Sequence, residues 1–429
     1  MQLMADHNSR RVLIILMLVA LAARVAVIPF VMADTLDPKR EFWSFGCEEG
    51  RIGRALASGE GFSSPLPART GPTAWSAPVY PVLIAITFKL FGIFSLASAW
   101  VLLVLSALFG ALTCIPVYFL AHRISERAGF WAACVWALHP YSISVSNALI
   151  WGYCLDALLL SLLLCYTIRL EEESSLLKWS GYGILWGFAS LDSPAVLAVL
   201  PFLIGWLAWR RQRSGRAWRF STVVAMLLLV FTVSPWFVRN YVTFGRFIPF
   251  RDNFWLVFWQ SNTGDLSNIY AKWANPPDNP AELAKFVRLG EIGYMQEKRA
   301  LALERLRQHP GEFLHATFKR VVYTWTGYWS LDSAHRKAMS EPMEIPNIGF
   351  CTLLTALMLA GIRRAWHLRW EAAAPLALVL LTFPVLFYIT HLSFDYRHPI
   401  DPVASVFIGV LFAGWHSADS AAFSGKCIR

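Results

Sequence analysis

The run VLIILMLVALAARVAVIPFV, residues 12–31, decides the fold class of this chain. It is apolar for about 20 residues, the length of a helix that crosses a bilayer, and it is longer than the ~7–15-residue apolar core of a signal peptide. Arg24 interrupts it, which favours a retained helix, although Val31-Met32-Ala33 weakly resembles a cleavage site and leaves removal as the alternative. Arg10 and Arg11 precede the run, so the positive-inside rule places the N-terminus in the cytoplasm.

The composition of the whole chain agrees with a membrane protein. Of 429 residues, 56% are hydrophobic and only 15% are charged, and 20 are Trp and 30 are Phe. The net charge of +10 comes from short basic clusters beside apolar runs, so it indicates topology and not a nucleic-acid partner. The seven cysteines form no CxxC pair, and most lie in apolar runs, so neither a disulfide framework nor a cysteine metal site is expected.

Apolar runs and basic loops together predict an all-α polytopic membrane protein with about ten transmembrane helices. Residues 1–238 are expected to form an N-terminal transmembrane region that carries a long outer loop, residues 34–95. Residues 239–345 are expected to form a small, mainly helical extracytoplasmic domain, and residues 346–429 a C-terminal transmembrane region. The spans after the first are expected near residues 96–120, 129–147, 149–169, 179–193, 195–209, 221–238, 347–362, 372–391 and 400–416.

Three further helices are expected outside the spans. The stretch from Pro78 to Phe91 is apolar but short, and it predicts a helix at the membrane interface. In the extracytoplasmic domain, apolar residues at near-helical spacing predict a helix from Ala281 to Gln308. A second is expected from Gly311 to Trp325.

Two adjacent carboxylates in the outer loop, Glu48 and Glu49, are the strongest candidates for chemistry. Arg51 follows Glu48 by three residues, so on a helix the two side chains share a face. A general base beside a cation that holds a phosphate is what transfer from a sugar phosphate needs. The alternative is that both carboxylates are simply solvated, as charges in a polar loop over a membrane usually are.

A series of motifs extends in order from the outer loop to the last span. The series comprises Glu48-Glu49-Gly50-Arg51-Ile52, Ala55-Leu56-Ala57-Ser58-Gly59-Glu60-Gly61-Phe62, Ala77-Pro78-Val79-Tyr80-Pro81, Ser234-Pro235-Trp236-Phe237-Val238-Arg239-Asn240-Tyr241, His309-Pro310 and Tyr396-Arg397-His398-Pro399. It resembles the GT-C glycosyltransferases, and among them the family-39 group that includes the protein mannosyltransferases and the aminoarabinose transferase of lipid A. Glu48 stands where Asp is usual and Ile52 where Tyr is common, so the resemblance implies the activity of the family and not the substrate of any one member.

The resemblance implies inverting transfer of a sugar from a polyprenyl-phosphate-linked donor to a hydroxyl of a lipid, glycan or protein acceptor. Glu48, beside Glu49, would take or align the acceptor proton as the bond to the lipid phosphate breaks. Positive charge must meet the leaving phosphate, and the candidates are Arg51, Arg239, Arg397 and Arg24. For Arg239 and Arg397 the alternative is snorkelling at a helix end, and Arg24 is expected to face a polar cavity within the membrane.

Three more side chains, Tyr80, Asp156 and His398, are expected near the substrate. For Asp156 the alternative is a charge that simply favours a helix N-terminus, and Asp192 is expected to be a helix cap. A cofactor is not required by the resemblance, since some GT-C enzymes use a divalent metal ion (Mg, Mn or Zn) and others do not. The acid pair alone supplies too few ligands for an oxygen cage.

The expected location is the bacterial inner membrane, with the active site on the periplasmic face. The expected partners are the lipid-linked donor, the acceptor and membrane lipids, with no nucleic acid. The alternative function is a transporter or flippase of a lipid-linked sugar. That function predicts ionisable groups along a path through several spans, whereas the predicted spans hold few besides Arg24 and Asp192.

Overall fold

The computed structural model describes residues 7–35, 45, 47–148, 150–263, 272–327, 344–390 and 394–424. Within these ranges the regular elements are helices, and no β-strand occurs apart from an isolated antiparallel bridge between Ser63 and Pro72. The prediction of an all-α polytopic membrane protein is confirmed. Five described segments are long and apolar enough to cross a bilayer: Ser9–Phe30, Leu96–His122, Tyr153–Leu170, Arg219–Phe244 and Asn347–His367.

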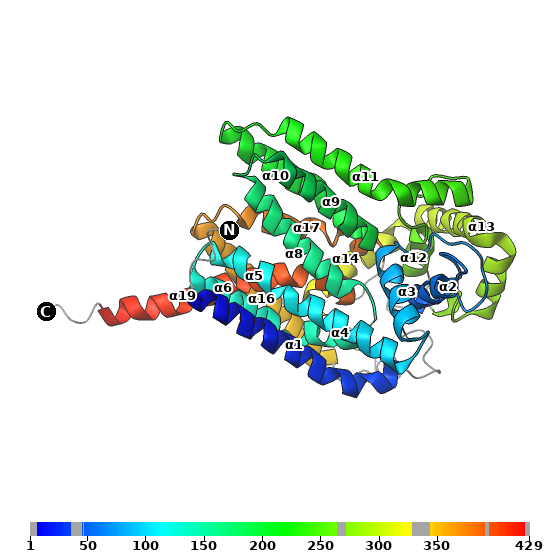
Figure 1. Cartoon of the computed structure of the whole chain (residues 1–429), viewed down its shortest axis with the longest axis horizontal. Coiled ribbons are helices and arrows are strands. Elements are labelled where there is room, and N and C mark those ends of the chain that lie inside the picture. Colours follow the sequence, from blue (N-terminus) through cyan, green and yellow to red (C-terminus); the bar gives the residue numbers. More distant parts are fainter. Residues whose placement is uncertain are drawn as a thin grey trace.

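The membrane helices lie roughly lengthwise in one bundle (Figure 1). In the bundle, α11 packs along α9, and α19 packs against both α6 and α16. The core is filled by large side chains, among them the fully buried Trp136, Trp179 and Trp186. The helices of the bundle are α1 (His7–Thr35), α4 (Leu96–Leu112), α5 (Cys114–His122), α6 (Glu126–Ala137), α7 (Pro140–Ala148), α8 (Tyr153–Leu170), α9 (Leu176–Asp192), η3 (Pro194–Ala198), α10 (Leu200–Arg213), α11 (Arg219–Phe244), α16 (Glu344–His367), α17 (Ala373–Thr382), α18 (Val385–Ile389), η5 (Phe394–Ile400) and α19 (Asp401–Ser424).

The span predicted over residues 129–147 is not one helix but two, α6 and α7. Pro140 cannot continue the helix before it, so the last carbonyl groups of α6 lose their helical partners. The guanidinium of Arg24, on α1, supplies the missing donors: its Nη1 donates to Ala137 O at 3.0 Å and its Nη2 to Trp136 O at 3.2 Å. The break therefore survives inside the bundle because a buried cation satisfies it.

The outer loop forms a compact layer at one end of the bundle, shown on the right of Figure 1. It contains α2 (Cys47–Ala57) and the predicted interface helix, α3 (Val79–Phe91). The two helices pack closely because Gly53 has no side chain: a Cβ there would lie 2.5 Å from Ile84 Cγ2. The polar chain between them carries Leu66 and Trp75 into a hydrophobic cluster with the outer helices described next.

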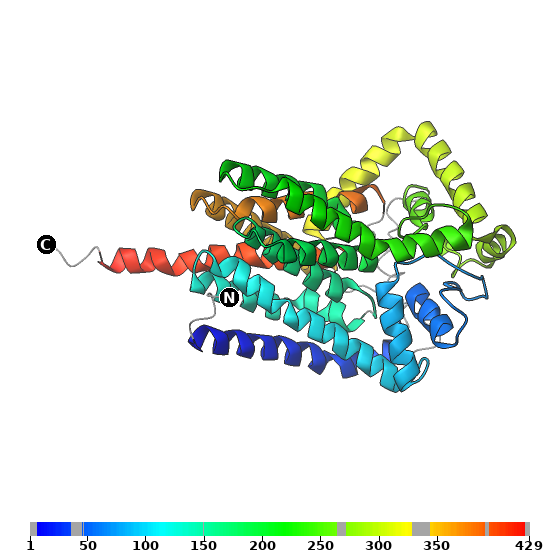
Figure 2. The same ribbon diagram turned by 45° about the horizontal axis from the view of Figure 1, so that its top comes forward.

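The outer helices begin later than the predicted boundary at residue 239. Because α11 is continuous to Phe244 and ends at Gly245, which has the left-handed φ of 63°, the chain leaves the bundle only there. The outer helices are α12 (Phe254–Ser261), η4 (Lys272–Ala274), α13 (Pro280–Gln308) and α14 (Pro310–Thr326). The last two match the predicted helices, except that α13 bends at Gly290, where φ is 68°. Figure 2 shows α14 returning from this layer to the bundle.

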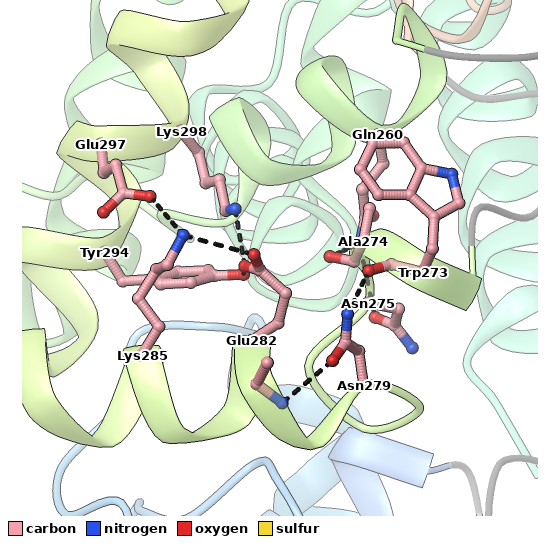
Figure 3. A network of polar contacts seen from close by, with 11 residues as sticks. Gln260, Trp273, Ala274, Asn275, Asn279, Glu282, Lys285, Tyr294, Glu297 and Lys298 are labelled. Atoms are coloured by element: carbon pink, nitrogen blue, oxygen red, sulfur yellow. Dashed lines mark hydrogen bonds and ion pairs between the residues drawn. The ribbon is translucent and has the colours of Figure 1, made fainter.

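A buried ion pair holds the two halves of α13 together (Figure 3). The side chain of Lys298 is fully buried, and its Nζ donates to Glu282 Oε2 at 2.6 Å. The hydroxyl of Tyr294 donates to the same oxygen at 2.6 Å, and the ammonium group lies 3.8 Å from the ring centroid of Trp259 on α12. The layer that faces the outer loop is thus fixed by a charge pair as well as by apolar packing.

Candidate functional site

The acid pair lies in the first turn of α2. Glu48 and Glu49 are only 9% and 6% exposed, so the interpretation as solvated loop charges does not hold. A helix N-terminus favours carboxylates there. The approach to the helix is tight: a Cβ on Gly50 would lie 1.9 Å from Phe45 O, so glycine is required at that position.

The carboxyl of Glu49 is held on one side and open on the other. Its Oε1 accepts a hydrogen bond from Ser76 Oγ at 2.8 Å, while its Oε2 has no partner among the described residues. Burial raises the pKa of Glu49 to about 8, with further contributions from Asp192 and Glu48, against the lowering effects of Ser76 and Arg251. Glu49 is therefore mostly protonated at neutral pH.

The carboxyl of Glu48 is buried as well, but two guanidinium groups act on it. Burial raises its pKa, Arg51 and Arg251 lower it, and Asp278 raises it further. Because both cations oppose the burial, Glu48 is the member of the pair better placed to be ionised. The two groups interact, so their titration belongs to the pair.

Arg251 belongs to the site although the sequence analysis did not select it. It lies between α11 and α12, and its Nε donates to Asn253 Oδ1 at 2.8 Å. The neighbouring Asp252 N–H donates to Ala74 O at 3.0 Å, which docks this corner on the outer loop. Arg251 is exposed, and its terminal nitrogens donate to no described residue. No sequence motif marks it, since only the fold brings this corner to α2.

Tyr396 is the first residue of the Tyr396-Arg397-His398-Pro399 motif, and its side chain interacts electrostatically with the acid pair. Its ring stacks on Phe387 with centroids 4.6 Å apart and meets Tyr153 at 6.0 Å. Burial raises the pKa of Tyr396 to about 12, and Arg251 and Glu48 act on it in opposite senses. Element η5 thus brings Tyr396 within electrostatic range of Glu48 and Arg251.

Asp156 and Asp192 gather on the bundle side of the acid pair. A Cβ built on Gly152 would lie 3.5 and 3.6 Å from the oxygens of Asp192 and 3.6 Å from Tyr80 Cδ2. Three buried carboxylate oxygens lack a hydrogen-bond partner among the described residues: both oxygens of Asp192 and Oδ1 of Asp156. The helix-cap interpretation of Asp192 is therefore wrong. The charge of Asp192 acts on Glu49, and the charge of Glu49 acts on Asp156. Tyr80 is buried, with its hydroxyl 3.3 Å from Ser106 Oγ.

The four arginines selected from the sequence all bind backbone carbonyl groups. Arg239 donates to Thr73 O at 2.6 Å and to Phe62 O at 2.8 Å, and so fixes the outer loop to the end of α11. Neither it nor Arg397 snorkels along a helix end. The other contacts are those of Arg24 with α6, of Arg51 with Pro65 O at 3.3 Å, and of Arg397 with Asp401 Oδ1 at 2.8 Å and Thr324 O at 3.1 Å.

His398 lies deeper in the bundle than Tyr396. It is fully buried, its ring centroid is 5.3 Å from that of Trp136, and its Nε2 is 3.7 Å from Cys154 Sγ. The structure therefore places His398 with Trp136 and Arg24 at the α6–α7 break, whereas Tyr396 of the same motif is within electrostatic range of Glu48.

The donor set for a metal ion is incomplete in the part of the chain that the structure describes. No group of three or more His, Cys, Asp or Glu side chains there converges as metal ligands. The buried oxygens of Glu49, Asp156 and Asp192 that lack partners do not amount to such a set. We therefore derive no step of a reaction through a metal ion.

Comparison with known proteins gives one family match and several matches in fold. Residues 75–237 match the family model described as dolichyl-phosphate-mannose-protein mannosyltransferase. No curated protein sequence matches the chain. The archaeal oligosaccharyltransferase AglB from Archaeoglobus fulgidus, in complex with an inhibitory peptide and a dolichol-phosphate, is similar over 99% of this chain and 52% of that chain, with a TM-score of 0.56 and 14% identity.

Two further solved structures are similar to this chain. The Archaeoglobus fulgidus oligosaccharyltransferase in complex with Zn and sulfate has a TM-score of 0.51 and 16% identity, over 94% of this chain and 49% of that chain. ArnT from Cupriavidus metallidurans bound to undecaprenyl phosphate has a TM-score of 0.41 and 15% identity, over 97% of this chain and 80% of that chain. We draw no argument from it. The chain spans about half the length of the oligosaccharyltransferase, and the likeness at this identity concerns the fold.

Proposed function

We propose that the chain is a membrane glycosyltransferase of the GT-C superfamily, and that it transfers a sugar, with inversion, from a polyprenyl-phosphate-linked donor to an acceptor hydroxyl. The observation that carries the proposal is the buried acid pair of α2 together with the exposed guanidinium of Arg251, whose terminal nitrogens donate to no described residue. A carboxylate of raised pKa next to such a cation suits a reaction that removes a proton and releases a phosphate.

The proton chemistry divides between the two acids. In the proposed reaction the acceptor oxygen attacks the anomeric carbon opposite the phosphate, and the acceptor proton passes to Glu48 as the carbon–oxygen bond to the phosphate breaks. Glu49, with a pKa of about 8, stays protonated and can donate a hydrogen bond from the oxygen that does not face Ser76. Its neutral form also spares Glu48 the repulsion of a second buried charge.

The leaving phosphate is met by Arg251 in this proposal. The electron pair of the breaking bond goes to the phosphate oxygen, so negative charge grows there. A guanidinium whose two terminal nitrogens donate to no described residue matches a phosphate in a bidentate manner. Arg51, which acts on Glu48 from the same helix, is the second cation of the site. Arg24, Arg239 and Arg397 would support the site by holding the backbone.

The proposal includes the side of the membrane on which the acid pair lies and the class of donor and acceptor. The positive-inside rule puts the acid pair on the outer face, the periplasmic face if the membrane is the inner membrane of a bacterium. The complex of AglB with a dolichol-phosphate supports a lipid-phosphate donor, and the acceptor class is a lipid, glycan or protein. The zinc in the second complex belongs to that protein, and no step here depends on a metal ion.

The test is a transfer assay on membranes that contain the protein. A panel of radiolabelled polyprenyl-phosphate sugars is supplied, and label in the acceptor fraction is measured for the unaltered protein, Glu48→Gln and Glu60→Gln. Glu60 is a matched control because it is exposed in the same loop and pairs only with Arg54 and Arg69 among the described residues. Loss of the base should lower the rate by about 10²–10⁴-fold, while the control keeps it.

Two results would reject the proposal. One is Glu48→Gln at the rate of the unaltered protein. The other is that the protein moves the lipid-linked sugar across the membrane without transferring it, and that Glu48→Gln still does so. That is the behaviour of a transporter or flippase.

A further inference from the structure

We propose that a cavity at the end of the bundle opposite the acid pair binds the phosphate-bearing headgroup of an anionic membrane lipid. The cavity has a volume of about 420 Å³ and lies between the ends of α5, α8 and α16 and the start of α17. Its distance from the acid pair follows from α8, which begins beside that pair and reaches the cavity 18 residues later, about 27 Å at the rise of a helix. The lining residues are Arg123, Ile124, Ile168, Glu171, Leu368, Arg369, Trp370, Glu371 and Ala372.

The depth of the cavity fits a headgroup. Three segments that can cross the bilayer end at His122, Leu170 and His367, and each of these residues directly precedes a residue of the lining. Where apolar spans end, the bilayer changes from hydrocarbon to headgroups. The hollow is therefore at the level of the lipid phosphates, on the side opposite the chemistry proposed above.

The charge of the cavity is positive although two acids line it. Arg210, from α10, binds both acids: its Nε donates to Glu171 Oε1 at 2.7 Å and its Nη2 to Glu371. Arg123 and Arg369 are exposed and have no ion pair or hydrogen bond from their side chains to the described residues. The two acids share the single guanidinium of Arg210, and with Arg123 and Arg369 the group carries a net charge of +1. A phosphate is the ligand that two guanidinium groups without a described partner suit.

A second basic hollow adjoins the first. It also has a volume of about 420 Å³, it shares Leu368 with the first cavity, and it is lined by Arg363, Arg364 and His367. The apolar walls formed by Ile124, Ile168 and Leu368 give the glycerol and the upper acyl chains of a lipid a surface to contact. Basic pockets between membrane helices on the positive side are typical headgroup sites.

The test compares lipid retention by the purified protein in detergent. Labelled phosphatidylglycerol and phosphatidylcholine are supplied to the unaltered protein, to Arg123→Gln/Arg369→Gln and to Arg127→Gln. Arg127 is the matched control, since it is exposed on α6 close to Arg123 but does not line the cavity. Because the altered arginines are exposed, each variant should fold, and the near-ultraviolet circular dichroism spectrum checks that it does.

The proposal expects the unaltered protein and the control to retain phosphatidylglycerol over phosphatidylcholine. The double variant should lose this retention by about 30-fold. Millimolar inorganic phosphate should displace little of the lipid, since it lacks the acyl chains. Equal retention by the double variant would overturn the proposal, and so would full displacement by inorganic phosphate, which would make this a site for free phosphate.

Discussion

Raising the pH should loosen the outer loop from the outer helices, because two carboxyl groups meet where they dock. Glu291, at the bend of α13, accepts hydrogen bonds from Thr73 Oγ1 at 2.5 Å and from Ala74 N–H at 2.6 Å. The backbone N–H of Asp252 donates to Ala74 O at 3.0 Å, so Ala74 is held by Glu291 and by Asp252 together. The charged groups that face them are Arg239, which acts on Glu291, and Arg251, which acts on Asp252.

The magnitude follows from the pKa of Asp252. Its carboxylate oxygens are buried, and burial raises the pKa from 3.8 to about 6; burial and Asp252 likewise raise that of Glu291. At a pH between the usual carboxyl pKa and the raised one, the docked state therefore binds more protons than the detached state. Docking weakens as the pH rises from the usual pKa to the raised pKa. About two pKa units correspond to about 3 kcal/mol from Asp252 alone, spread over about pH 4–6, and Glu291 extends the loss to higher pH.

Hydrogen–deuterium exchange measures this directly. Protection of the Ala74 and Asp252 amides, corrected for the intrinsic exchange rate, should fall about a hundredfold between pH 4.5 and pH 7.5. The variant Glu291→Gln cannot ionise at that position and should keep only the part of the pH dependence that Asp252 supplies, below about pH 6. Glu304→Gln, an exposed acid on the same helix, should keep it. Equal protection at both pH values in the unaltered protein, or an unchanged dependence in Glu291→Gln, would refute the reasoning.

Four substitutions give further expected outcomes. Arg251→Gln should raise the KM for the donor by about tenfold to a hundredfold, since a charge-assisted contact is lost, while the exposed Arg246→Gln should leave it unchanged. Lys298→Met leaves the carboxylate of Glu282 without its buried partner and should destabilise the protein by about 3 kcal/mol, seen as a lower Tm that Glu282→Leu partly restores. Arg24→Leu should lower the Tm with an unchanged donor KM in the folded fraction, because its contacts are structural; a changed KM at unchanged Tm would contradict this. Gly50→Ala should abolish transfer by shifting the acid pair away from Phe45 O, and full activity would show that the close contact is absent.

The helices could be predicted from the sequence because their signals are local. Apolar runs, basic loops and proline predicted the interface helix, both long outer helices and the positions of most bundle helices, although the predicted spans 129–147, 195–209 and 372–391 are each divided into two elements. The break at Pro140 was missed because a helix interruption inside a membrane depends on a distant partner, here Arg24. The boundary at residue 239 was placed too early for a similar reason, since polar residues at the end of α11 are bound by the outer loop.

The acid pair could be selected from the sequence, whereas the cation facing it could not. Glu48, Glu49 and Arg51 are neighbours on one short helix, so their spacing shows the arrangement. Arg251 is about 200 residues further along and belongs to no motif, and only the contact of Asp252 with Ala74 brings it to the site. Asp192 was taken for a cap because of the proline after it, but its carboxylate faces Gly152 and the acid pair.

Photo-crosslinking tests most directly whether a lipid phosphate lies between the acid pair and Arg251. A short polyprenyl phosphate with a diazirine beside its phosphate is irradiated with the protein, and the labelled peptides are identified by mass spectrometry. We predict adducts in the peptides that contain Arg251 and Tyr396, which Arg251→Gln reduces. Adducts confined to the opposite end of the bundle, around Arg123 and Arg369, would contradict the proposed active site.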